Sequence, residues 1–293
     1  MRLSIYKETE EPVESICFEE AHIAEVLSAI QKNFPKYFKS FVDDKPARNF
    51  GKIIGEAIED FEKDRARYQE ILELEALEEH EDDPNYFKSE ILKNKCPVIR
   101  KTLRTNDKDF EKYKLKFHCA DANELLEKVT TICRFGYDCH QDPKKLSKIN
   151  FLDTEDCSVY GVIGGGIKTL FLYKLYPALF PSRSQEALWA LYFLSGQGSF
   201  DCDYESEFLM IDDAKKFVTH QNYFYPCELF YRYACEIYKL LECEAAKINL
   251  SLNKNYRYVA VDAFLSSVAE VHKSEIDFYK NQILDGGSAH DQA

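Results

Sequence analysis

The amino-acid sequence predicts a mainly α, multi-helix globular protein with at most a small β element near the centre. Of the 293 residues, 45% are hydrophobic and 14% aromatic, which is enough for a sizeable core and argues against global disorder. Glycine and proline are scarce (11 and 9), unlike in a turn-rich β-sandwich. Apolar residues also recur at helical spacing in several long segments.

The chain is organised around residues 157–196, which hold a short apolar run, a triple glycine and two apolar segments that flank a Phe-Pro-Ser-Arg-Ser turn. Ser182 or Ser184 in that turn can cap the next helix, and Gly196 can end it. This helix is apolar on nearly all sides, through Leu188, Trp189, Leu191, Tyr192, Phe193 and Leu194. We expect either a central buried helix or one that buries a side in a partner, with Trp189 and Tyr192 in the interface.

Earlier in the chain, residues 1–18 are compatible with a strand. Residues 19–33 form an amphipathic helix that Pro35 is expected to end. The next helical segments begin at Pro46, with apolar spacing over 50–79, and at Pro84, with a short helix to residue 95 that Pro97 closes. Asp121, followed three residues later by Glu124, has the form of an N-cap, so we expect a helix over 122–134.

Later in the chain, residues 208–211 predict a short strand and 221–226 an aromatic loop. Helices are expected over 227–248 and, as one or two pieces, over 256–284. The polar stretch 137–150 is the predicted boundary between an N-terminal helical region with an acidic segment (1–150) and a C-terminal helical core (151–285). A flexible tail (286–293) follows.

Charge and cysteine content indicate the setting in which the protein works. The formal net charge of −13 repels nucleic-acid backbones at long range, so we expect any contact with nucleic acid to be indirect. The sequence shows neither the apolar core of a signal peptide nor an apolar run long enough to span a bilayer, so we expect no membrane partner. Ten cysteines in this context indicate free thiols in a reducing compartment, and we expect a cytoplasmic location.

Residues 70–83 carry eight acidic side chains and no lysine or arginine. One interpretation is a solvated helix end that runs into an acidic loop. The other is a docking surface for a basic partner, with Glu78 and Glu79 in the interface. Residues 100–116 gather the opposite charge, either as a basic patch or as an exposed face of mixed sign.

A glycine-rich segment runs from Gly161 to Thr169. An apolar run, glycines and then a helix present backbone N–H groups to an anion, so Gly164, Gly165, Gly166 and Lys168 are candidate phosphate ligands. The segment departs from the phosphate-loop pattern by one inserted residue, Ile167. The alternative is structural: the glycines let the backbone pass close to a neighbouring element or adopt positive φ.

A second candidate is the acid-rich segment 201–207, followed by an apolar run and Asp212-Asp213-Ala-Lys215. Carboxylates on one face of an extended chain can bind Mg²⁺. An apolar strand followed by acid-x-Lys is similar to the local form of the PD-(D/E)xK nuclease core. That resemblance implies Asp203 and Asp213 as metal ligands and Lys215 as the basic partner. It covers residues 201–215 only, and acid-x-Lys recurs at 43–45 and 142–144, so an exposed acidic loop is the alternative.

Zinc is a third possibility, because thiolates and imidazoles gather in one part of the sequence: His118, Cys119, Cys133, Cys139, His140 and Cys157. The sequence contains no Cys-x-x-Cys pair, which favours buried free thiols, and the metal, if any, stays unassigned.

No motif in the sequence unites a nucleophile, a base and an orienting acid. The leading hypothesis is therefore a non-catalytic accessory or regulatory subunit of a larger intracellular assembly, with protein partners. Such an assembly could act on nucleic acid through its other members. The alternatives are a Mg²⁺-dependent nuclease and a nucleotide- or phosphate-binding protein; whether the chain is an enzyme stays open.

Overall fold

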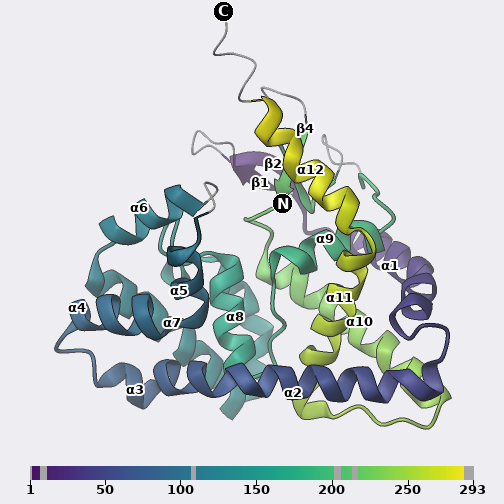
Figure 1. Ribbon diagram of the computed structural model, residues 1–293, viewed down its shortest axis with the longest axis horizontal. Helices are drawn as coiled ribbons and strands as arrows, with labels where there is room; N and C mark the ends of the chain where they lie inside the picture. Colours follow the sequence, from purple (N-terminus) through teal and green to yellow (C-terminus); the bar gives the residue numbers. More distant parts are fainter. Residues whose placement is uncertain (1, 7–11, 107–109, 201–205, 213–216, 287–293) are drawn as a thin grey trace, which may run out of the picture.

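The computed structural model describes residues 2–6, 12–106, 110–200, 206–212 and 217–286, and it is mainly α-helical, which confirms the predicted fold class (Figure 1). The long helix α2 (Pro46–Leu72) runs along one side of the molecule, and the other helices pack in two groups along its length. Near its start α2 contacts α11 (Arg257–Val271), and further along it contacts α8 (Gly165–Leu175).

The elements follow one another closely. In the first half they are β1 (Arg2–Tyr6), β2 (Pro12–Cys17), α1 (Glu20–Phe41), α2, α3 (Leu74–Glu78), α4 (Pro84–Tyr86), the π-helix η1 (Phe87–Lys95), α5 (Pro97–Arg104), α6 (Glu111–Cys119) and α7 (Ala122–Gln141). In the second half they are the 3-10 helices η3 (Pro143–Asp153) and η4 (Glu155–Cys157), α8, α9 (Gln185–Leu194), β3 (Leu209–Asp212), β4 (Phe217–Gln221), α10 (Cys227–Lys247), the 3-10 helix η5 (Lys254–Tyr256), α11 and α12 (Lys273–Gly286).

The β structure in the described residues consists of two antiparallel pairs, β1 with β2 and β3 with β4, each with one register shift. They confirm the strand character predicted for residues 1–18 and 208–211. The apolar run at 159–163 forms only an isolated bridge between Val159 and Ile163. The strand pairs therefore lie outside the central stretch of the sequence.

Helix α1 continues through Pro35, so the prediction that this proline ends the helix is wrong. A proline inside a helix removes one backbone donor and costs about 3 kcal/mol. Beyond it, however, Tyr37, Phe38 and Phe41 are all buried, and the ring of Phe38 contacts that of Phe50 in α2, with centroids 5.1 Å apart. Burial of three aromatic side chains outweighs the local cost.

Helix α2 begins at Pro46, as predicted, but ends at Leu72 instead of continuing to residue 79. Glu73 is extended (ψ 145°) and interrupts the helix, and the short helix α3 that follows buries Leu77 completely. The helix predicted over 84–95 is α4 continued by the π-helix η1, which buries Phe87, Ile91 and Leu92.

The predicted caps are confirmed. The Asp121 carboxylate accepts a hydrogen bond from the Glu124 N–H (2.9 Å), and α7 continues to Gln141 rather than ending at residue 134. Of the two serines proposed for α9, Ser184 is the cap: its hydroxyl accepts from the Ala187 N–H at 3.0 Å. Gly196, with φ +79°, follows the last turn of α9.

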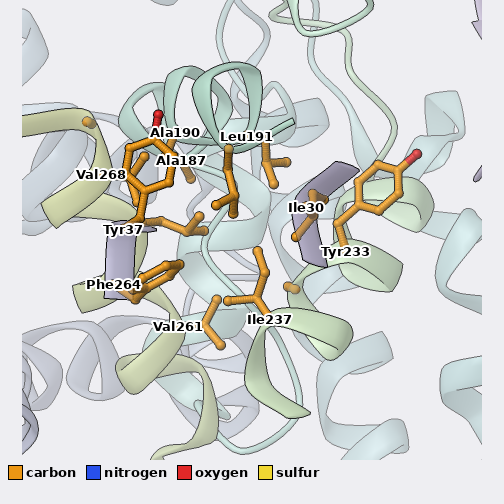
Figure 2. Packing of buried hydrophobic residues seen from close by; sticks show 14 of the residues in the cluster. Ile30, Tyr37, Ala187, Ala190, Leu191, Tyr233, Ile237, Val261, Phe264 and Val268 are labelled. Carbon is orange, nitrogen blue, oxygen red and sulfur yellow. The ribbon is translucent and has the colours of Figure 1, made fainter. Parts of the chain in front are cut away.

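The buried side chains form two clusters. The first core combines α1, the first half of α2, α9, α10 and α11, and Figure 2 shows its centre, where Ala187, Ala190 and Leu191 of α9 meet side chains of α1, α10 and α11. The second core combines the end of α2 with α3, η1, α7 and one side of α8. Helix α2 contributes to both, through Phe61 in the first core and Tyr68 in the second.

The two cores do not follow the order of the chain. The first core joins residues 23–61 to residues 173–276, and the second joins residues 68–180 to Cys227. The division at residue 150 stays a prediction about domain organisation, and the packing found here crosses it. Among the described residues, no helix is both long enough and apolar enough to span a bilayer.

Candidate functional site

The triple glycine begins helix α8. Gly164 is the N-cap residue, exposed to solvent, and no atom lies within 4 Å of the place where a Cβ would stand. A helix leaves its first N–H groups without intrahelical partners. In the described part of the chain, no acceptor satisfies the backbone N–H of Gly165 or of Gly166.

Arg183, from the turn between α8 and α9, covers the first residue of α8. A Cβ added to Gly165 would lie 1.7 Å from Nη2 of Arg183, which no atom tolerates. Gly165 therefore lets the guanidinium lie against α8, and a larger residue would force the Arg183 side chain to move, which agrees with the structural interpretation of the glycines. The other groups of Arg183 hold it in place: its backbone N–H donates to Thr169 Oγ1 at 3.1 Å.

The guanidinium of Arg183 also joins two motifs that lie far apart in the sequence. Its Nη2 donates to the Tyr223 carbonyl (2.8 Å) and its Nη1 to the Asn222 carbonyl (3.4 Å). The aromatic loop at 221–226 therefore lies beside the triple glycine. Arg183 is 3% exposed, and its Nε is buried without a hydrogen-bond partner. Burial lowers the pKa of Arg183 below its ordinary value.

Lys168, in the first turn of α8, is buried as well. Its ammonium donates to the Leu152 carbonyl and to Ser158 Oγ, the latter at 3.1 Å. These bonds point Lys168 into the protein, so its charge acts on the site through space rather than by contact. The pKa of the Cys227 thiol is raised to about 12, chiefly by burial and also by Asp153, while Lys168 and Arg183 oppose the shift.

The carboxylate of Asp153 lies in the same region. It accepts hydrogen bonds from the backbone N–H groups of Cys227 (2.8 Å) and Glu228 (3.2 Å), and so caps the start of α10. Its charge reaches Arg183 without an ion-pair contact. Asp153 and Arg183 were not predicted as site residues, because the groups they contact lie in other segments of the sequence.

The acidic segment forms one end of the molecule, where α2 gives way to α3 and the following turn (Figure 1). All eight of its acidic side chains are exposed: Glu70, Glu73, Glu75, Glu78, Glu79, Glu81, Asp82 and Asp83. We call these eight residues the acidic end. Within the described part of the chain, two of them have a cation within 4 Å: Glu70 lies 3.7 Å from Lys95, and Glu78 lies 3.7 Å from Arg134.

The backbone beneath the acidic end is firmly held. Leu77 anchors α3 in the second core with no exposed surface, and the Asp83 carboxylate accepts a hydrogen bond from the Tyr86 N–H at 3.0 Å. The imidazole of His80 packs against the rings of Tyr86 and Phe87, with centroids 5.7 and 5.8 Å away. The carboxylates are therefore presented from an ordered surface.

Trp189 and Tyr192, proposed as interface residues, belong to the first core. They are 1% and 4% exposed, and every residue from Ala187 to Leu194 is buried. The ring of Trp189 stacks on Tyr279 of α12 with centroids 5.7 Å apart. Helix α9 is thus the central buried helix of the two alternatives, and we correct the assignment of these two residues to a surface.

The nuclease residues Asp203, Asp213 and Lys215 lie outside the described residues, so that hypothesis stays a prediction. The last acid of the same segment, Glu207, is described and fully buried. Its carboxylate accepts a hydrogen bond from the Tyr225 hydroxyl (2.9 Å) and pairs with His22 Nε2 (2.8 Å). Glu207 thus connects the segment before β3 to α1 and to the aromatic loop, and its role is structural.

The cysteines and histidines proposed for zinc do not converge. In the parts of the chain that are described, no group of three His, Cys, Asp or Glu side chains is placed to hold a metal ion. All nine described cysteines have free thiols, and five of these are buried in the second core: Cys96, Cys133, Cys139, Cys157 and Cys227.

Comparisons with family models, with curated proteins and with solved structures found no match to this chain.

Proposed function

We propose that the protein is a non-catalytic accessory or regulatory subunit that binds a basic surface of a partner protein through its acidic end. The observation that carries this proposal is the concentration of eight exposed carboxylates on one ordered surface, two of which have a cation in reach. Complementary charge gives such a surface fast and selective association with a basic partner.

The position of these charges on the helices adds support. Neither α2 nor α3 has a basic residue in its last turn, and acidic residues lie there instead, at Glu70 in α2 and at Glu78 and Glu79 around the end of α3. A negative charge at a helix C-terminus opposes the helix dipole. The free protein therefore carries an unfavourable electrostatic arrangement, which bound cationic side chains would relieve.

The test is a pull-down of the tagged full chain from its native host, with partners identified by mass spectrometry and stoichiometry measured by sizing. The decisive variant is Glu75→Lys with Glu79→Lys, because both side chains are exposed and neither contributes to an ion pair in the described structure. We expect a stoichiometric partner with the wild-type chain and its loss with the double variant.

The matched control is Glu25→Lys with Glu59→Lys, which makes the same change in net charge at exposed positions of α1 and α2 away from the acidic end. The control should retain the partner. Equal loss of the partner in both double variants would mean that binding depends only on net charge. Retention of the partner in both would mean that the interface lies elsewhere. Either result overturns the proposal.

A further inference from the structure

We propose that the N-terminus of α8 binds a phosphate group, held by the free N–H groups of Gly165 and Gly166 and by the guanidinium of Arg183. This site is separate from the acidic end and does not depend on the function proposed for it. Positive features gather here, and among the described residues no acidic side chain caps this helix or contacts its two neighbouring cations, although Asp153 lies in the same region.

The first positive feature is the helix end itself. The N-terminus of a helix carries the equivalent of about half a positive charge, and acidic side chains or bound anions usually lie there. Helices α7 and α10 follow this rule, with the carboxylates of Asp121 and Asp153. The cap of α8 is Gly164, which has no side chain to accept a hydrogen bond.

The second feature is a pair of buried cations. Lys168 and Arg183 are 5% and 3% exposed, and among the described residues no carboxylate lies within 4.0 Å of either charged group. Buried charges are normally paired, because leaving them unpaired is costly. Both cations lie near a helix end of the same sign, which adds to the cost.

The contrast with Arg65 shows how unusual this arrangement is. Arg65 donates from Nε and Nη2 to the carbonyls of Lys174 (3.1 Å) and Leu175 (3.2 Å), at the C-terminus of the same helix. That is the end where a cation is favoured. Arg65 also pairs with Glu62 at 2.9 Å. The two arginines thus lie at opposite ends of α8. Arg65 contacts a carboxylate, whereas Arg183 contacts none among the described residues.

The donor groups at this helix end are of the kind that binds a small tetrahedral anion. The guanidinium of Arg183 lies directly against Gly165, and its Nε still has a free N–H. Gly164 is exposed, with open space beside it, so an anion can approach from solvent. Backbone N–H groups together with an arginine fork form a donor set that suits phosphate oxygens.

The experiment is a calorimetric titration of the full chain with inorganic phosphate, AMP and adenosine at low ionic strength. We expect phosphate and AMP to bind and adenosine not to bind. If AMP binds at least tenfold more tightly than phosphate, the ligand is a nucleotide or a similar phosphate ester; equal affinities assign the site to the free anion. The proposal is overturned if neither phosphate nor AMP binds with a Kd below about 10 mM.

Two sets of variants test the residues. Arg183→Gln should weaken phosphate binding at least tenfold, whereas Arg65→Gln, at the other end of α8, should leave it unchanged. Gly164→Asp places a carboxylate at the cap position and supplies the missing negative charge from the protein. It should raise the melting temperature and abolish phosphate binding, and Gly164→Asn, a neutral cap of the same shape, should retain more of the binding. Undiminished binding in Gly164→Asp refutes the site even if Arg183→Gln does not fold.

Discussion

Asp262 of α11 shows how a single residue can make the stability of this fold depend on pH. Its carboxylate accepts a hydrogen bond from the Tyr173 hydroxyl of α8 at 3.4 Å. Burial raises the pKa of Asp262 from 3.8 to about 6; Lys174 opposes the shift and Glu186 adds to it. Between these two pKa values the folded protein binds more protons than the unfolded chain. The contribution of Asp262 to the free energy of unfolding therefore falls as the pH rises from about 4 through 6.

Replacing Asp262 with asparagine should remove this dependence. The asparagine side chain stays neutral at every pH, so Asp262→Asn should raise the free energy of unfolding by about 1–2 kcal/mol at pH 8. At pH 4, where the aspartate of the folded protein is already protonated, the variant and the wild type should differ little. Urea unfolding at the two pH values measures the difference, and a gain of equal size at both would mean that the carboxyl does not ionise as described.

The role of a residue can be predicted from the sequence where it acts on its immediate neighbours. Asp121 and Ser184 cap helices because their side chains reach an N–H three residues away, and that relation is visible in the sequence. The role of Arg183 could not be predicted in this way, since its partners include Gly165, Asn222 and Tyr223. The sequence around an arginine in a turn does not predict these contacts, because they form only when distant segments come together in the fold.

Among the elements, α9 shows how a local sequence feature, an N-cap serine before an apolar run, leads to a buried helix. The helix is apolar on nearly all sides, so its position depends on how the chain enters it from the Phe-Pro-Ser-Arg-Ser turn. Ser184 fixes that entry by accepting the Ala187 N–H. The errors in predicting helix ends have a different origin: after Pro35 and after Glu73, the next apolar side chains are buried against other elements, and this tertiary packing decides the backbone path.

Removal of the α9 cap should therefore weaken the fold by a defined amount. Ser184→Ala is expected to lower the free energy of unfolding by about 1 kcal/mol, because the Ala187 N–H loses its acceptor. Ser182→Ala, two residues earlier in the same turn, removes a hydroxyl that does not cap the helix and serves as the control. Chemical denaturation measures the free energy of unfolding of both variants. An equal decrease in both would show that Ser184 does not act as the cap.

The whole molecule is joined by α2, which contributes buried side chains to both cores. The sequence analysis recognised the apolar side of this helix. It could not show that Phe61 and Tyr68, seven residues apart, belong to different clusters, since that division is set by long-range packing. Because one continuous helix would have to break before the cores could separate, we expect them to unfold together.

Trp189 can be used to test whether the two cores unfold together, since it is the only tryptophan and lies in the first core. Leu72→Ala removes a fully buried side chain from the second core and should cost about 2–5 kcal/mol. With one cooperative unit, the thermal transition followed by Trp189 fluorescence should shift downward together with the helical transition followed by circular dichroism. A fluorescence transition that stays in place would show that the cores unfold separately.

The distribution of sulfur in the protein has a practical consequence. Among the nine described cysteines, the five buried thiols all belong to the second core, and burial raises their pKa values well above neutral, as for Cys157, whose pKa is about 11. A thiol that is both enclosed and protonated reacts slowly with alkylating reagents and oxidants, because the thiolate is the nucleophile. The rate at which these five cysteines are alkylated in the native protein therefore reports how often the second core opens. No label has to be introduced for this measurement.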